Sequence, residues 1–117
     1  MRWAERLTHA LGEPSSETIS WAQIKGSGTT ALFGSENVSS LTDNAGGDYT
    51  VTWTIPYATA SSYAVVLGTS GTTNATTLHF RGLQAITATS ARTSLLDYNA
   101  ASATDPDYAY LIALGEF

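Results

Sequence analysis

The chain has 117 residues, enough for one domain with a single modest core. Apolar residues make up 43% of it and charged residues only 13%, which is typical of a globular protein with few surface charges. The net charge is −5, and no basic stripe is present that would neutralise a run of phosphates, so we expect no nucleic-acid binding. Because the chain has no cysteine, disulfides and thiolate zinc sites are excluded.

The N-terminal residues carry charges where a secretory signal needs an apolar core, and no apolar run is long enough to cross a bilayer. We therefore expect synthesis in a host cytoplasm, no cleaved secretion signal and no membrane insertion. A particle released by lysis fits this expectation.

Residues 1–11 are predicted to form a short helix, because Trp3, Leu7 and Leu11 fall on one apolar stripe. Gly12 and Pro14 end it. A helix of this length does not hold alone in water. The stripe must therefore pack on its own domain, on copies of itself or on a neighbouring protein.

The segment Gly12–Glu17 reads as a linker and favours the neighbouring protein. Trp3, Leu7 and Leu11 are accordingly the candidate anchor side chains. We expect an anchor helix with its linker over residues 1–18 and a separate β domain over residues 19–117.

From residue 19 onward the apolar pattern has a period of two, and turn formers recur at short intervals. Short strands with frequent turns predict an all-β fold, an antiparallel β-sandwich. The expected strands are Ile19–Lys25, Thr30–Ser35, Asn37–Thr42, Tyr49–Ile55, Tyr63–Gly68, Thr77–Arg81, Leu83–Ala88, Ala91–Tyr98 and Tyr108–Leu114.

The strongest strand prediction is Tyr49–Ile55, where large apolar residues alternate with threonine after the glycine-rich turn Asp43–Asp48. We expect its bulky side chains to be buried. Trp21 and Tyr63 also lie within predicted strands, and we expect them to fill the core together with Trp53 of this strand.

Four segments resemble a family of phage tail-fibre and tail-tip receptor-binding domains. They are the run Asn37–Trp53 (NVSSLTDNAGGDYTVTW), its lead-in Trp21–Thr29, the strand Tyr63–Val66 and the closing stretch from Asp105 to Tyr108. The resemblance covers about residues 19–117, and its first half is the specific part.

The resemblance implies a β-sandwich that assembles as a homotrimer at the tip of a particle appendage. The implied function is that of a structural virion protein, a small tail fibre or fibre tip, which attaches to host cell-surface polysaccharide or protein. Tail or capsid proteins would hold it through its N-terminus. A capsid decoration or head-fibre protein, a lectin-like carbohydrate-binding module and a carbohydrate-cleaving domain are the alternatives.

Receptor contacts in such a protein would lie on loops. The candidate distal loops are Asp43–Asp48, Thr69–Asn74 and Asn99–Asp105. Because turn positions are usually exposed, the candidate receptor contacts are Asn44, Tyr57, Asn74, Tyr98 and Asn99.

The sequence contains no recognisable catalytic motif, and we expect no enzyme activity and no cofactor. Ser70 lies in a Gly-Thr-Ser-Gly loop that is one residue short of a nucleophile elbow. Asp105 and Asp107 flank Pro106 and read as solvated turn acids. No metal site is expected, although three copies of His79 on a trimer axis would form one.

Overall fold

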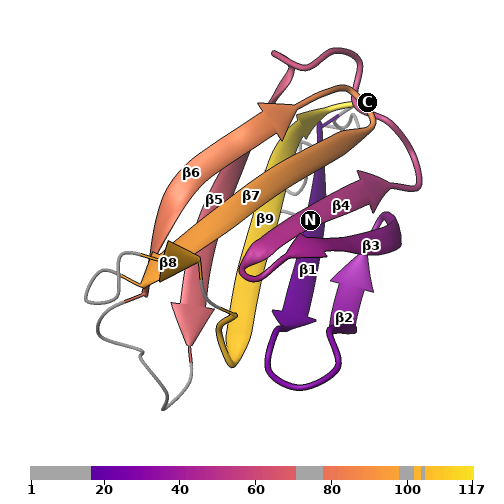
Figure 1. Cartoon of the computed structure of the whole chain (residues 1–117). Helices are drawn as coiled ribbons and strands as arrows, with labels where there is room; N and C mark the ends of the chain where they lie inside the picture. The colour runs from indigo at the N-terminus through magenta and orange to yellow at the C-terminus, as the bar shows by residue number, and fades with distance from the viewer. Residues whose placement is uncertain (1–16, 71–77, 98–101, 104) are drawn as a thin grey trace.

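The computed structural model describes residues 17–70, 78–97, 102–103 and 105–117, and these residues form nine β-strands and no helix (Figure 1). The strands are β1 (Glu17–Lys25), β2 (Ala31–Glu36), β3 (Val38–Ala45), β4 (Asp48–Trp53), β5 (Tyr63–Ser70), β6 (Leu78–Ile86), β7 (Ser90–Asp97), β8 (Ser102–Ala103) and β9 (Tyr108–Glu116). The all-β prediction is therefore confirmed for the described residues. The predicted helix over residues 1–11 lies outside them.

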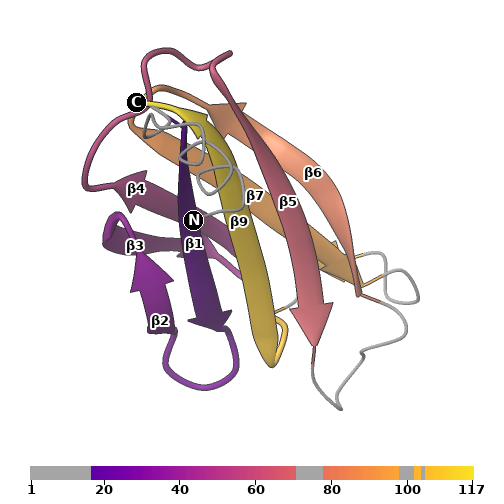
Figure 2. The ribbon, with the colours of Figure 1, turned by 180° about the vertical axis from the view of Figure 1, so that it is seen from behind.

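The strands form two antiparallel sheets. Sheet A has the order β2-β1-β9-β5, and sheet B has the order β3-β4-β7-β6 with β8 paired to the end of β7. Figure 1 shows sheet B as the nearer layer, and Figure 2 shows sheet A from behind. The first and last strands, β1 and β9, pair along their whole length, from Glu17 with Glu116 to Lys25 with Tyr108.

Both sheets direct alternate side chains into one shared core, as strand geometry requires when one face of each sheet is buried. On β4, Tyr49 and Val51 are completely buried and Trp53 is 3% exposed. This confirms the predicted alternation of that strand. Sheet A contributes the side chains of Ala22, Ile24, Tyr63, Ala109, Leu111 and Ala113, and β7 of sheet B contributes Ala91 and Leu95.

Three buried tyrosines, Tyr49, Tyr57 and Tyr63, hold hydrogen bonds inside the fold, and we refer to them as the core tyrosines. The rings of Tyr57 and Tyr63 stack with centroids 4.1 Å apart, and Trp53 meets both rings edge-on. The Tyr57 hydroxyl lies 2.7 Å from the Ser20 hydroxyl of β1. The Tyr63 hydroxyl lies 2.8 Å from the Thr87 carbonyl oxygen and 2.9 Å from that of Ser90, so it links the two sheets.

Three burial predictions are wrong. Trp21 is 39% exposed, because its neighbours Ala22 and Ile24 take the inward positions of β1. Ile55 is 52% exposed, because β4 ends at Trp53 and the inward alternation ends with it. Tyr57 was expected at the surface but is only 2% exposed, since the chain beyond Pro56 turns inward and seats its ring on Tyr63.

The two strands predicted on either side of Gly82 are one strand in the structure. β6 runs unbroken from Leu78 to Ile86 along β7, with register shifts between Phe80 and Gly82 and between Leu83 and Ala85. These shifts are β-bulges, which bend a strand and break its alternation without ending it. The alternation of apolar and polar residues is therefore interrupted around Gly82, and in the sequence this interruption resembles a turn between two strands.

Candidate functional site: the polar face of sheet B

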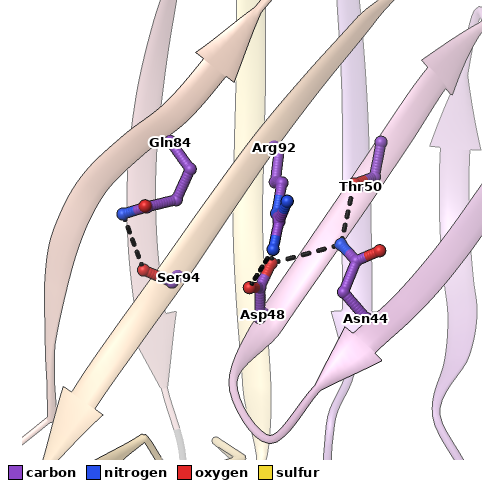
Figure 3. Close-up of polar contacts among 6 residues, drawn as sticks. All are labelled: Asn44, Asp48, Thr50, Gln84, Arg92 and Ser94. Carbon is purple, nitrogen blue, oxygen red and sulfur yellow. Dashed lines mark hydrogen bonds and ion pairs between the residues drawn. The ribbon is translucent and has the colours of Figure 1, made fainter.

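The outer faces of the two sheets differ in chemistry. The outward residues of sheet B are mostly hydroxyl, amide and charged side chains, whereas sheet A directs large apolar side chains outward. An antiparallel sheet with one solvated face normally carries polar residues there, as sheet B does. A group of six polar residues on β3, β4, β6 and β7 forms the candidate site (Figure 3).

The centre of this group is an ion pair between adjacent strands. The Arg92 guanidinium of β7 donates two hydrogen bonds to the Asp48 carboxylate of β4, from Nε at 2.9 Å and from Nη2 at 2.7 Å. The Asn44 amide of β3 donates to the same carboxylate at 3.1 Å and to the Thr50 hydroxyl at 2.8 Å. Beside them, the Gln84 amide donates to the Ser94 hydroxyl at 3.0 Å.

These contacts fix the protonation state of the pair. The hydrogen bond from Arg92 is the main cause that lowers the pKa of Asp48, and the Asp48 carboxylate in turn raises the pKa of Arg92. Both groups therefore stay charged at neutral pH. The Arg92 side chain is 46% exposed, and the bidentate geometry holds it in one orientation.

The arrangement is suited to hydrogen bonding with an extended polar ligand. The Arg92 guanidinium and the amides of Asn44 and Gln84 are exposed, and their hydrogen bonds to the less exposed Asp48, Thr50 and Ser94 pre-order them, which lowers the entropic cost of binding. A carboxylate that is held charged by a guanidinium is a poor general acid. Within the described part of the chain, no group of acidic or imidazole side chains is placed to hold a metal ion.

A second polar contact joins two of the predicted distal loops. Asp105 accepts hydrogen bonds through Oδ1 from the Gly47 backbone nitrogen and from the Tyr49 hydroxyl, both at 2.7 Å. Asp105 is exposed, as predicted for a turn acid, but these two donors also give it a structural role that the sequence did not indicate. Burial and this carboxylate raise the pKa of Tyr49 well above its ordinary value. The β3–β4 turn is thereby tied to the segment that leads into β9.

Asn37, the first residue of the segment with the family resemblance, has a structural role. Its φ of 57° is a left-handed conformation that asparagine tolerates better than most residues. Its side chain donates to the Ser20 hydroxyl at 2.9 Å and to the Ile55 carbonyl at 3.1 Å, and it accepts from the Ile55 nitrogen at 2.7 Å. It thereby joins β1, the start of β3 and the exit from β4.

A pocket of about 310 Å³ opens beside Asn37, at the lower end of the size range of ligand sites. It is lined by Ile19, Glu36, Asn37, Thr54, Ile55 and Phe117. Its lining is mixed: Ile19, Ile55 and Phe117 supply apolar surface, and Glu36 and Thr54 add polar groups beside the Asn37 amide, which is engaged on both its atoms.

The structure places the predicted receptor contacts differently from one another. Asn44 is exposed and belongs to the polar group, so its side chain is accessible to a receptor. Tyr57 is buried and is not available to a receptor. The remaining candidates, Asn74, Tyr98, Asn99, Trp3, Leu7 and Leu11, lie outside the described residues. The His79 backbone lies in β6, but its side chain is outside the description, so the axial site stays a prediction.

Sequence reasoning missed Asp48 and Arg92 as a pair, because they are 44 residues apart and only the pairing of β4 with β7 brings them together. The available signal was weak: Arg92 is a charged residue within the predicted strand Ala91–Tyr98, and Asp48 is the last residue of the predicted turn Asp43–Asp48. The chain matches no known family model, no curated protein and no solved structure. The described residues include no helix of the length and hydrophobicity needed to span a bilayer.

Proposed function

We propose that the protein is a non-enzymatic adhesion module of a phage particle, a β-sandwich that assembles as a homotrimer and binds polysaccharide or protein on the host surface. The proposal rests on the family resemblance of Asn37–Trp53 and on one structural observation. That segment folds as the β3–β4 hairpin and supplies Asn44, Asp48 and Thr50 to the polar group, where Asp48 binds the half-exposed Arg92 of β7.

The positions of the chain ends support this use of the fold. The described chain begins and ends together, where Glu17 pairs with Glu116. The β1–β2 turn and the segment before β9 lie at the opposite end, where Gly26 donates to the Asp107 carbonyl (Figure 1). Attachment near the chain ends would leave the opposite end and the sheet B face free for a receptor.

Weak contacts are sufficient for such a role, because several copies on one particle bind the same surface together and gain avidity. The same chemistry suits a lectin-like module, since amide, guanidinium and hydroxyl groups hydrogen-bond sugars equally well outside a particle. Attachment to a tail or capsid protein through the N-terminal segment stays a prediction.

The binding test uses the full chain against immobilised bacterial surface polysaccharides and whole cells. We expect the double variant Asn44→Ala, Arg92→Ala to lose binding and Lys25→Ala, which also removes one positive charge but lies on sheet A, to retain it. Equal binding by both variants would exclude the polar group as the contact surface. Release of shorter saccharides during incubation would favour the carbohydrate-cleaving alternative.

The assembly test is a native mass measurement, for which we expect three times the 12.3 kDa mass of one chain. A monomer at micromolar concentration would contradict the homotrimer. Labelling of the protein on intact particles would distinguish a tail fibre from a capsid decoration protein. If neither the tail nor the capsid carries the label, the virion location is contradicted.

A further inference from the structure

The outer face of sheet A is apolar across the strands β1, β9 and β5, which Figure 2 shows side by side. Strand register aligns its side chains in rows: Ile19 of β1 is paired with Leu114 of β9, and Trp21 is paired with Ile112. On the other side of β9, Val66 of β5 is paired with Ile112. These five side chains are between 39% and 65% exposed, and we call them the apolar face.

An apolar face of this kind marks a surface that another element covers. Single exposed apolar residues are ordinary, but here the side chains are neighbours within one sheet and no polar residue separates the rows. The pocket beside Asn37 continues the apolar surface beyond Ile19, around the end of β1.

The chain itself enters the described part at this point. Glu17 begins β1 only two residues before Ile19. The linker of residues 12–16 spans up to about 17 Å when extended, enough for the preceding residues to turn back over the sheet. Residues 1–11 carry the apolar stripe of Trp3, Leu7 and Leu11, for which the sequence alone leaves three partners open.

We propose that residues 1–11 pack this stripe on the apolar face of their own chain. The sizes match: four strands about 4.8 Å apart make a sheet about 14 Å wide, and an eleven-residue helix is about 16 Å long. A helix laid on one face of an antiparallel sheet is a common two-layer arrangement. A helix too short to persist alone is then stabilised by the surface that it covers.

Area and charge favour the N-terminal segment over a second copy of the chain. From the strand spacing and rise, the apolar rows cover about 14 Å by 14 Å, or about 200 Å², while a stable interface between subunits buries about 800 Å² on each partner. Glu36 and Glu116 border the face, and neither has an ion-pair partner among the residues that the structure describes. Arg6 lies on the flank of the predicted stripe, where it would meet such carboxylates.

This inference is independent of the adhesion proposal and assigns the stripe a different partner from a particle protein. Side chains that cover the sheet are not free to anchor the chain elsewhere. Attachment to a particle would then use another surface of the protein.

The test uses engineered cysteine pairs in the full chain, which has no native cysteine to interfere. The pair Leu7→Cys, Ile112→Cys joins the middle of the stripe to the middle of the apolar face. Two control pairs are Glu5→Cys, Ile112→Cys, from the opposite side of the helix, and Leu7→Cys, Thr52→Cys, on sheet B. A disulfide requires Cα atoms within about 7 Å, so only a packed pair closes efficiently.

We expect the first pair to form a disulfide within one chain, seen as a monomer on a non-reducing gel and as the mass of an oxidised single chain. At about 10 μM protein, a millimolar effective concentration would close it on the order of a hundredfold faster than a pair on separate chains. Equal yields from all three pairs would overturn the proposal. Disulfide-linked dimers or trimers would also overturn it, in favour of a second copy.

A stability measurement provides the second test and does not depend on cysteine chemistry. Leu7→Asp should lower the midpoint of urea unfolding, because it places a charge between the helix and the sheet. Thr8→Asp adds the same charge off the stripe and should leave the midpoint unchanged. If Leu7→Asp also leaves the midpoint unchanged, the stripe does not pack on the apolar face.

Discussion

The tie between Asp105 and the β3–β4 turn should contribute several kcal/mol to stability. Asp105 accepts from two donors at 2.7 Å, and one of them is the hydroxyl of the fully buried Tyr49. A hydrogen bond to a charged group contributes about 1.5–3 kcal/mol, and an unsatisfied buried donor costs about 1–3 kcal/mol. Since Asp105 itself is exposed, we discount the sum and expect Asp105→Ala to destabilise the protein by about 3 kcal/mol.

Tyr49→Phe should cost less, about 1–2 kcal/mol, because it removes one hydrogen bond and leaves an exposed carboxylate that water can solvate. Once the hydroxyl is gone, Asp105→Ala loses only its bond to Gly47. The two substitutions should therefore be non-additive, with a coupling of about 1–2 kcal/mol in a double-mutant cycle.

Equilibrium urea unfolding of the four proteins measures the cycle. Substitutions that add within about 0.5 kcal/mol would refute the reasoning, because the hydroxyl and the carboxylate would then not interact. Glu36 of β2 serves as the control, because it precedes β3 at the end of the β3–β4 hairpin that lies away from Tyr49, and Glu36→Ala should show no coupling to Tyr49→Phe.

Further predictions concern local features of the fold. Asn37→Ala should cost about 2–3 kcal/mol in urea unfolding, since it loses hydrogen bonds and strains a left-handed residue, whereas Asn37→Gly keeps the backbone conformation and should cost about 1 kcal/mol less. Gly115→Ala places a Cβ against the Ser62 carbonyl oxygen and the Tyr63 backbone, and it should cost about 3 kcal/mol in the same assay, with a lowered melting temperature. The pKa of Asp48 is lowered in the folded state, so its ion pair makes a small contribution to stability that is present above the unfolded pKa of about 4. This contribution is lost as pH falls through the folded pKa. The Arg92→Ala variant should therefore lose less stability on the acid side than the unsubstituted protein does. Burial raises the pKa of each of the core tyrosines, so their contribution to stability should be complete below about pH 10 and be lost above it, and the phenolate absorbance of these three tyrosines should appear only as the protein unfolds.

The placement of strands followed from local patterns that do not depend on distant residues. The alternation of Tyr49, Val51 and Trp53 with threonines shows both the strand and its buried face. Glycines at 46 and 47 supply the turn, and Gly47 adopts the positive φ of 66° that such turns use. The turn is shorter than the predicted Asp43–Asp48, because β3 continues to Ala45 and only Gly46 and Gly47 lie between the two strands.

Burial in β1 was not decidable from its sequence. In a strand, Ile19 and Trp21 point to one face and Ala22 and Ile24 to the other, so both faces of β1 carry apolar residues and the sequence does not show which face is buried. Pairing with β9 and packing against sheet B selected the face with the smaller residues, and this left Trp21 outside. The exposed apolar face is a result of that choice.

The sequence by itself determined the all-β class, most strand positions and the main hairpin, because a period of two and the conformational preferences of glycine and proline act over a few residues. Only the tertiary structure decided which face of β1 is buried, that Tyr57 turns inward, and that Asp48 meets Arg92 and Tyr49 meets Asp105. These contacts join positions 37 to 56 residues apart, and they depend on the order of strands in the sheets, which a local pattern does not encode.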